Sequence, residues 1–351
     1  MTEIRPLERS DLPAVASLMA ARLPAWNRDE SFLAETLIDQ RWAAPELPSL
    51  VAVDGEGAIL GFIGAQVRRL RLDDRVLWGV CCSHLVVVDD RRAGPAGALL
   101  LRRLLAGEQD LTWTDTATDG VIRMWRTFGG DIDHARSLDW MLVLRPLRWA
   151  RDVLMTRVRR RGPVGRLAPA RAVPFHAVGP RLAPHTFPSP PADVHGADAT
   201  AAEIAGSLDD LTRDLRLFVD YDAAVLDQLF TLIEAEADPL VRRLVRRGDV
   251  VIGWYAYLLR RGGASRVLHV CGRAPEMEAV VGELVDDARG RGSAVLTGRL
   301  EPHLGTALSE RSAVLGFARC PLIHSRELEV RALLATDFSL LTDLDGEWFA
   351  T

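Results

Sequence analysis

The chain has 351 residues, which is enough for two domains of ordinary size. Apolar residues make up 48% of it and charged residues 26%, a composition typical of soluble globular proteins. The formal net charge of −5 at pH 7 excludes a general electrostatic attraction to nucleic acid or to an anionic membrane.

The first 147 residues predict one α/β domain, a central mixed sheet flanked by helices. Apolar runs predict its strands at residues 4–7, 50–53, 59–67, 76–88, 111–115 and 140–144. Helical spacing of apolar residues predicts its helices at residues 12–22, 30–40, 98–105 and 119–128. Hairpins rather than crossover helices join the early strands, which disfavours a P-loop or Rossmann fold.

Residues 148–196 predict a basic linker rich in proline and arginine. Ten arginines fall from Arg145 through Arg181 against a single acid, Asp152. Two interpretations stay open. The segment is either a connector with a solvated basic face, or it flanks a cleft and attracts an anionic cofactor, substrate or carrier domain.

Residues 197–351 predict a second domain with the element order of the first. Its expected strands lie at residues 240–246, 250–259, 266–272, 295–298 and 322–324, and its helices at residues 200–236, 276–291 and 303–311.

Two further absences narrow the class of protein. No apolar run reaches the ~18–20 residues of a membrane span, and no signal-peptide core opens the sequence, so we expect a cytoplasmic protein. The cysteines lack metal-ligand spacing, so we expect reduced thiols and no metal site.

The segment from Leu85 to Leu105 carries the strongest functional signal. An apolar strand and an acidic turn lead into a basic loop of small residues, 91–97, and then into a leucine-rich helix. Backbone N–H groups converge where such a loop meets a helix, and the helix dipole favours negative charge. We therefore expect an anion cradle that holds the diphosphate of a cofactor.

This pattern resembles the GNAT superfamily of acyl-CoA N-acyltransferases, in which a bulged strand and a loop R/Q-x-x-G-x-G/A precede the helix that binds the coenzyme A diphosphate. Two registers fit the loop, Arg92 to Gly97 or Arg91 to Ala96, and Pro95 replaces a motif glycine in the first. The resemblance implies acetyl-CoA or another acyl-CoA as cofactor, bound by Leu85, Val87, Arg91, Arg92, Ala93, Gly94, Ala96, Gly97, Ala98 and Trp125. It also implies two GNAT-like domains in tandem, and Gly272 to Pro275 lacks the later glycines of the cradle, so we expect cofactor binding only in the first.

Amide formation from a thioester needs a base for the amine and a proton for the leaving thiolate. Cys81 occupies the position of the family's glutamate base, and His84, Ser83 and Asp115 are the other catalytic candidates. Each has a structural alternative: burial for the thiol, core packing for the histidine and helix capping for the aspartate. Trp125 stands near the position of the family's tyrosine acid, which an indole does not replace.

Polar and aromatic side chains of the second half are the candidates for the acceptor site: Tyr255, Tyr257, His269, Arg299 and Glu301. We expect an acyltransferase that acts on an amine of a small metabolite, sugar or peptide, by direct attack on the thioester. Two alternatives remain: a GNAT-fold interaction protein that has lost catalysis, and an acyltransferase that takes its acyl group from a carrier-protein thioester.

Overall fold

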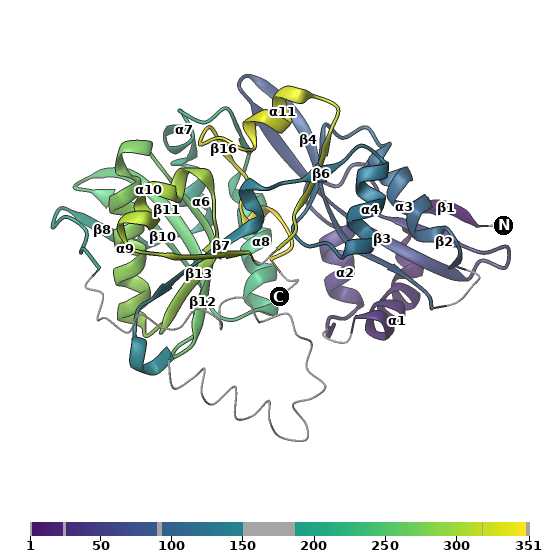
Figure 1. The fold of residues 1–351 in the computed structure, drawn as a ribbon, viewed down its shortest axis with the longest axis horizontal. Coiled ribbons are helices and arrows are strands. Elements are labelled where there is room, and N and C mark those ends of the chain that lie inside the picture. Colours follow the sequence, from purple (N-terminus) through teal and green to yellow (C-terminus); the bar gives the residue numbers. More distant parts are fainter. Residues whose placement is uncertain (1, 24–25, 90–92, 150–186, 318, 349–351) are drawn as a thin grey trace.

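Two mixed β-sheets, each flanked by helices, lie side by side in the computed structural model (Figure 1). The structure describes residues 2–23, 26–89, 93–149, 187–317 and 319–348. This architecture confirms the predicted α/β class with two sheets. Most of the predicted linker, residues 150–186, lies outside the described residues, so its basic face stays a prediction.

The first sheet has nine strands. Seven form its main path, in the order β1 (Glu3–Pro6), β2 (Leu50–Val53), β3 (Ile59–Leu72), β4 (Arg75–Val87), β5 (Leu111–Thr114), β15 (Leu322–Ser325) and β6 (Asp131–Ile132). Two short strands extend it beside β3, namely β9 (Leu217–Val219) and β16 (Ser339–Leu340).

The second sheet has seven strands. Their order is β8 (Val194–Asp198), β10 (Leu240–Arg247), β11 (Val250–Leu258), β12 (Ala264–Gly272), β13 (Val295–Arg299), β7 (Leu138–Val143) and β14 (Val314–Phe317). Along the main path of each sheet the pairings follow the same pattern, because β4 and β5 are parallel, β12 and β13 are parallel, and all other neighbours are antiparallel. The predicted repeat of element order is therefore present in the fold.

The two halves of the chain contribute strands to each other's sheet. The expectation that the strand near residues 140–144 completes the first sheet is wrong, because β7 pairs with β13 and β14 in the second. In return β15, from the second half, lies between β5 and β6 of the first sheet. Sheet membership therefore does not follow the expected boundary at residue 147.

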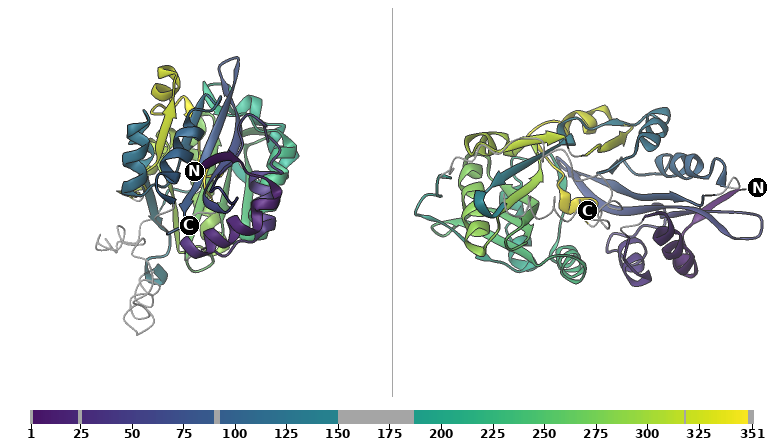
Figure 2. Two further views of the ribbon diagram at one scale, coloured as in Figure 1. Left: turned by 90° about the vertical axis from the view of Figure 1, so that its right-hand side faces the viewer. Right: turned by 60° about the horizontal axis from the view of Figure 1, so that its bottom comes forward.

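Helices cover both faces of the first sheet (Figure 2). On one face lie α1 (Leu12–Arg22) and α2 (Glu30–Leu37), and on the other α3 (Ala96–Leu105) and α4 (Asp119–Thr127). Leu100, Leu101, Leu104 and Leu105 of α3 are all buried, because their spacing places them on one side of the helix. The Asp29 carboxylate caps α2 by accepting a hydrogen bond from the N–H of Phe32.

The predicted helical region at residues 200–236 divides into three helices and a strand. The helices are α6 (Ala201–Ala205), α7 (Leu208–Leu211) and α8 (Ala223–Glu236), and β9 precedes α8. Asp222 starts α8 by capping the N–H of Val225. The remaining helices are α9 (Met277–Arg291), α10 (Gly305–Glu310) and α11 (Leu328–Leu333).

Candidate functional site

Strands β4 and β5 separate part-way along the first sheet. Their parallel pairing runs from Gly79 opposite Leu111 to Cys81 opposite Trp113, where it ends. Beyond Cys81, β4 pairs only with β3. Carboxyl ends of parallel strands that part in this way open the sheet, and such openings are common ligand sites in α/β folds.

A β-bulge lies on β4 just past this separation. Ser83 pairs with Gly64 and Val86 with Phe62, so His84 and Leu85 together face Ile63. His84 has a φ of 54°, a left-handed conformation that non-glycine residues rarely adopt. Bulges redirect side chains next to active sites, and a strained backbone at this position supports a functional role.

The expected anion cradle lies at the start of α3. Gly94 has a φ of 38°, and Pro95 precedes the helix without a side-chain cap. The first intrahelical hydrogen bond runs from the N–H of Leu99 to the carbonyl of Pro95, so the N–H groups of residues 96–98 stand at the open helix end. Gly97 is half-buried, and a Cβ there would meet only Val87 Cγ1, at 3.5 Å.

The other predicted cofactor residues divide into three groups. Leu85, Val87 and Ala98 are half-buried at this end of the sheet, where a ligand can reach them. The side chains of Ala93 and Ala96 are buried, so only their backbone is available. Arg91 and Arg92 lie outside the described residues.

The prediction that Trp125 contacts the cofactor is wrong. Its side chain is completely buried, and its Nε1 donates a hydrogen bond to the carbonyl of Ile323 on β15 at 3.0 Å. A Cβ at Gly130 would collide with the indole ring. Trp125 therefore anchors the exchanged strand and does not face a ligand.

The catalytic candidates on β4 differ in their surroundings. Cys81 is completely buried, and burial raises the pKa of its thiol far above the ordinary value, so it is no nucleophilic thiolate. Ser83 is also buried, and its Oγ has no hydrogen-bond partner among the described residues. His84 packs edge-on against Trp26, and burial lowers its pKa to about 4, which makes it a weak proton acceptor near neutral pH.

Asp115, at the end of β5, is tied to the second half of the chain. Its Oδ1 accepts a hydrogen bond from Arg299 Nη1 at 2.6 Å, and both side chains are buried. Arg299 also contacts Glu301 at 2.8 Å. This buried pair places the end of β5 directly against the end of β13.

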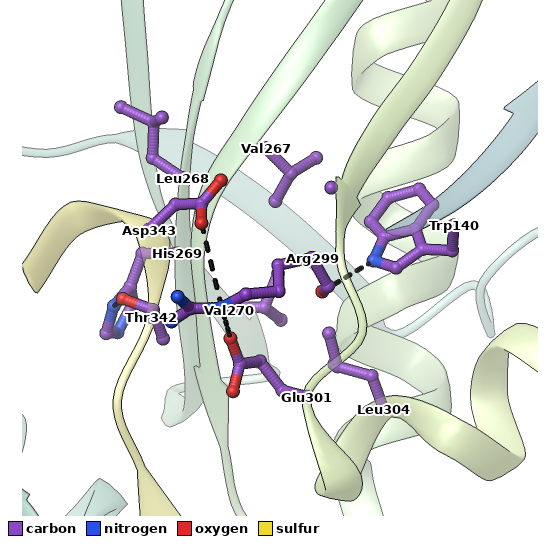
Figure 3. Close-up of a pocket in the computed structure, with 11 residues that line it drawn as sticks. Trp140, Val267, Leu268, His269, Val270, Arg299, Glu301, Leu304, Thr342 and Asp343 are labelled. Atoms are coloured by element: carbon purple, nitrogen blue, oxygen red, sulfur yellow. Dashed lines mark hydrogen bonds and ion pairs between the residues drawn. The ribbon is translucent and has the colours of Figure 1, made fainter. Parts of the chain in front are cut away.

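The predicted acceptor residues do not form one site. His269, Arg299 and Glu301 line a small hollow together with Thr342 and Asp343 (Figure 3). His269 stacks on Trp254, and its Nδ1 lies 2.9 Å from Thr342 Oγ1. The hollow lies where β12 and β13 part, beyond the pairing of Arg266 with Thr297.

Tyr255 and Tyr257 lie on the opposite face of the second sheet. Both rings are completely buried, and their hydroxyls donate hydrogen bonds to Glu283 and Asp287 of α9. They belong to the core beneath that helix, so their prediction as acceptor ligands is wrong.

Sequence reasoning missed Glu347, which lies close to the separation of β4 and β5. Its Oε2 accepts hydrogen bonds from Thr114 Oγ1 and Asp115 N, both at 3.0 Å. Burial and the neighbouring Asp115 carboxylate raise the pKa of Glu347 to about 7. The local sequence, Asp343-Leu344-Asp345-Gly346-Glu347-Trp348, does not single out Glu347 from the two neighbouring acids or reveal its distant partner.

The described residues contain no group of three or more His, Cys, Asp or Glu side chains that could hold a metal ion. None of the helices among them is long and apolar enough to cross a membrane.

Comparisons with known proteins identify the fold. No family model and no curated protein matches the sequence. A probable N-acyltransferase from Enterococcus faecalis V583 is 8% identical, with a TM-score of 0.61 over 93% of this chain and 73% of its own. The chain has a GNAT fold.

Two GCN5-related N-acetyltransferases show the same likeness. The structure from Anabaena variabilis is 10% identical, with a TM-score of 0.62 and 74% of its chain covered. That from Kribbella flavida is 12% identical, with a TM-score of 0.55 and 71% covered. Each match covers 93% of this chain, so it includes both sheets.

Proposed function

We propose that the chain is an acyltransferase that moves an acetyl or other short acyl group from acyl-CoA to an amine of a small molecule. One observation carries the proposal: the bulge of β4, the separation of β4 from β5 and the open N-terminus of α3 lie at the same end of the first sheet. A diphosphate at the helix and a thioester at the separated strands would fit this arrangement. The GNAT fold adds support by analogy.

The cradle of the first half suits the diphosphate of coenzyme A. The N–H groups of residues 96–98 and the positive end of α3 supply hydrogen bonds and a favourable field. Gly97 leaves space for an anion to approach the backbone, because only Val87 lies near its missing Cβ. Bound there, acyl-CoA would supply a thioester whose carbonyl is open to attack.

The second half does not suit the same cofactor. At the start of α9, Glu276 holds the N-cap position and is ion-paired with Arg247, and the loop before it lacks the later glycines of the α3 cradle. Arg299 and Glu301 line the opening between β12 and β13. We therefore assign the donor to the first half alone, and the second half supports it through Arg299 and Asp115.

The residues of the first sheet would orient the reaction. The unpartnered Ser83 Oγ offers a hydrogen bond to a polar group at the opening. The expected tyrosine acid is absent, since Trp125 is committed to β15, so water would protonate the leaving thiolate.

Calorimetric titration of the purified chain with acetyl-CoA tests the proposal. We expect one site with micromolar affinity, and release of coenzyme A thiol when a primary amine is added. Absence of binding would overturn the proposal. Loading from an acyl carrier protein in that case would favour the carrier-thioester alternative.

A further inference from the structure

The chain brings Glu347 to the end of β5 through a close backbone approach. A short 3₁₀ turn, Asp343–Asp345, precedes Gly346, where a Cβ would collide with the Asp115 carboxylate. The N–H of Glu347 then donates a hydrogen bond to Asp115 Oδ2 at 2.7 Å. Glycine at position 346 is what allows this contact.

The two carboxylate oxygens of Glu347 are not equivalent. Oε2 accepts from Thr114 Oγ1, from the N–H of Asp115, and from both the N–H and the Oγ1 of Thr116, at 3.0–3.3 Å. All four of these hydrogen bonds go to Oε2 and none to Oε1. The carboxylate is thus held firmly by one oxygen and has the other available.

Unpartnered polar atoms gather on the same part of the sheet. Gln66 lies opposite Cys81 on β3, and Trp113 lies beside Cys81 on β5. Gln66 Nε2, Trp113 Nε1 and Ser83 Oγ are all buried without a hydrogen-bond partner among the described residues. Buried polar groups are nearly always satisfied, so this row points to a polar ligand.

Contacts between aromatic side chains show that this site lies on the face of the first sheet that α1 and α2 cover. Trp348, next to Glu347, packs edge-on against Phe32 of α2, with ring centroids 6.2 Å apart. Trp26 packs against both Phe32 and His84. The cradle helix α3 lies on the opposite face (Figure 2), so an acceptor and the donor diphosphate would approach the sheet from different sides.

We propose that Glu347 is the catalytic base that removes the proton from the acceptor amine. This inference rests on the proposed acyltransferase function. Oε1 accepts a proton from the amine, and the nitrogen forms a bond to the thioester carbonyl carbon. The C–S bond breaks, its electron pair leaves with sulfur, and water protonates the thiolate. Glu347 then releases its proton to solvent.

Charged and titratable groups around Glu347 fit this role. Asp115 lies beside it and is ion-paired with Arg299 of the second sheet. Arg68 on β3 is engaged with the carbonyl of Asp345 and the amide oxygen of Gln66. The Glu347 charge raises the pKa of the buried Cys81 and Cys82, which places it within electrostatic reach of both thiols.

The test compares the wild-type chain with Glu347→Gln, and with Glu56→Gln in the exposed β2–β3 turn as control. Calorimetry measures the affinity of each protein for acetyl-CoA. The rate of thiol release is measured across pH with and without benzylamine. Infrared spectroscopy follows the carboxyl titration of the ligand-free protein. We expect the same acetyl-CoA affinity in all three proteins. In Glu347→Gln alone, the rate of thiol release should be about 10²–10⁴-fold lower. The limb of the pH–rate profile near pH 7, where the rate of the wild type rises with pH, should be lost in the same variant. The infrared signal of a carboxyl titrating near pH 7 should vanish only in that variant.

A second variant separates a base from a structural residue. Thr114→Val keeps Glu347 but removes one hydrogen bond to the charged carboxylate, so the limb should move to higher pH. The inference would be overturned if Glu347→Gln kept the rate and the pH–rate profile of the wild type. It would also be overturned if the limb near pH 7 did not move in Thr114→Val. Either result would leave the proposed function standing. Acetyl-CoA binding without any thiol release would also count against Glu347. No acetyl-CoA binding by the wild type would instead overturn the proposed function.

Discussion

Burial moves two titratable side chains near the end of β4 in opposite directions. It lowers the pKa of His84 to about 4 and, together with Asp115, raises that of Glu347 to about 7. The cause is the same, because each group loses water around its charged form. A group that changes charge near neutrality is the better proton acceptor at physiological pH.

His84→Ala should therefore leave the limb near pH 7 in place. An imidazole with a pKa of about 4 is already neutral above pH 6, so removing it takes away packing against Trp26 but no titration in that range. The measurement is kcat/KM for thiol release between about pH 5 and 9. A profile that flattens in His84→Ala would return the role of base to the histidine.

Gly97 allows a matched pair of variants in the cradle. Gly97→Glu places bulk and negative charge at the start of α3, so acetyl-CoA affinity should fall on the order of tenfold or more. Gly97→Ala adds a methyl group that meets only Val87 at 3.5 Å, so folding should be unaffected. Calorimetry measures both variants, and wild-type affinity in Gly97→Glu would remove the diphosphate from this helix.

At the scale of elements, local pattern predicted most strands and helices but not their partners. The hairpin of β2 and β3, the long strand β4 and the leucine-rich α3 follow from alternation, turn residues and helical spacing. The apolar stretch of β7 is equally compatible with either sheet, because a strand's own residues specify its faces and not its neighbour. The exchange with β15 is therefore outside what one segment encodes.

Some residues of the candidate site follow from local sequence pattern, and others come together only in the folded chain. The cradle and the strand before it are contiguous, so their pattern was visible around Gly94 and Gly97. Glu347 reaches Asp115 across 232 positions of sequence, and no spacing rule connects them. Tyr255 and Tyr257 were misplaced because strand alternation puts them on one face without saying which element covers it.

The hydrogen bond of Trp125 should stabilise the exchanged strand β15 without affecting the cofactor site. Trp125→Phe keeps a ring in the core but removes the hydrogen bond to Ile323 on the exchanged strand, so unfolding free energy should fall by about 1 kcal/mol. Acetyl-CoA affinity should not change. Urea unfolding and calorimetry measure the two quantities. A loss of affinity at wild-type stability would instead support contact between this indole and the cofactor.

Across the whole molecule, the two sheets are joined by more than the chain connecting them. Each sheet contains a strand from the other half, and the buried Asp115–Arg299 pair joins β5 to β13. Removing one member of a buried ion pair typically destabilises a protein by about 3–5 kcal/mol. The geometry around Glu347 thus depends on the second half, even though that half does not suit a cofactor of its own.

Stability against pH distinguishes a functional carboxyl from a structural one. The pKa of Glu347 is raised on folding, so its contribution is present below the ordinary value of 4.5 and is lost as pH rises toward about 7. Glu347→Gln has no such charge to bury. Between those pH values the variant should gain up to about 3 kcal/mol relative to the wild type, as measured by urea unfolding at several pH values. A difference independent of pH would mean that Glu347 keeps an ordinary pKa in the folded chain. A gain that grows with pH would show that the protein retains a destabilising carboxyl where β4 and β5 separate, as expected for a site selected for chemistry rather than for stability.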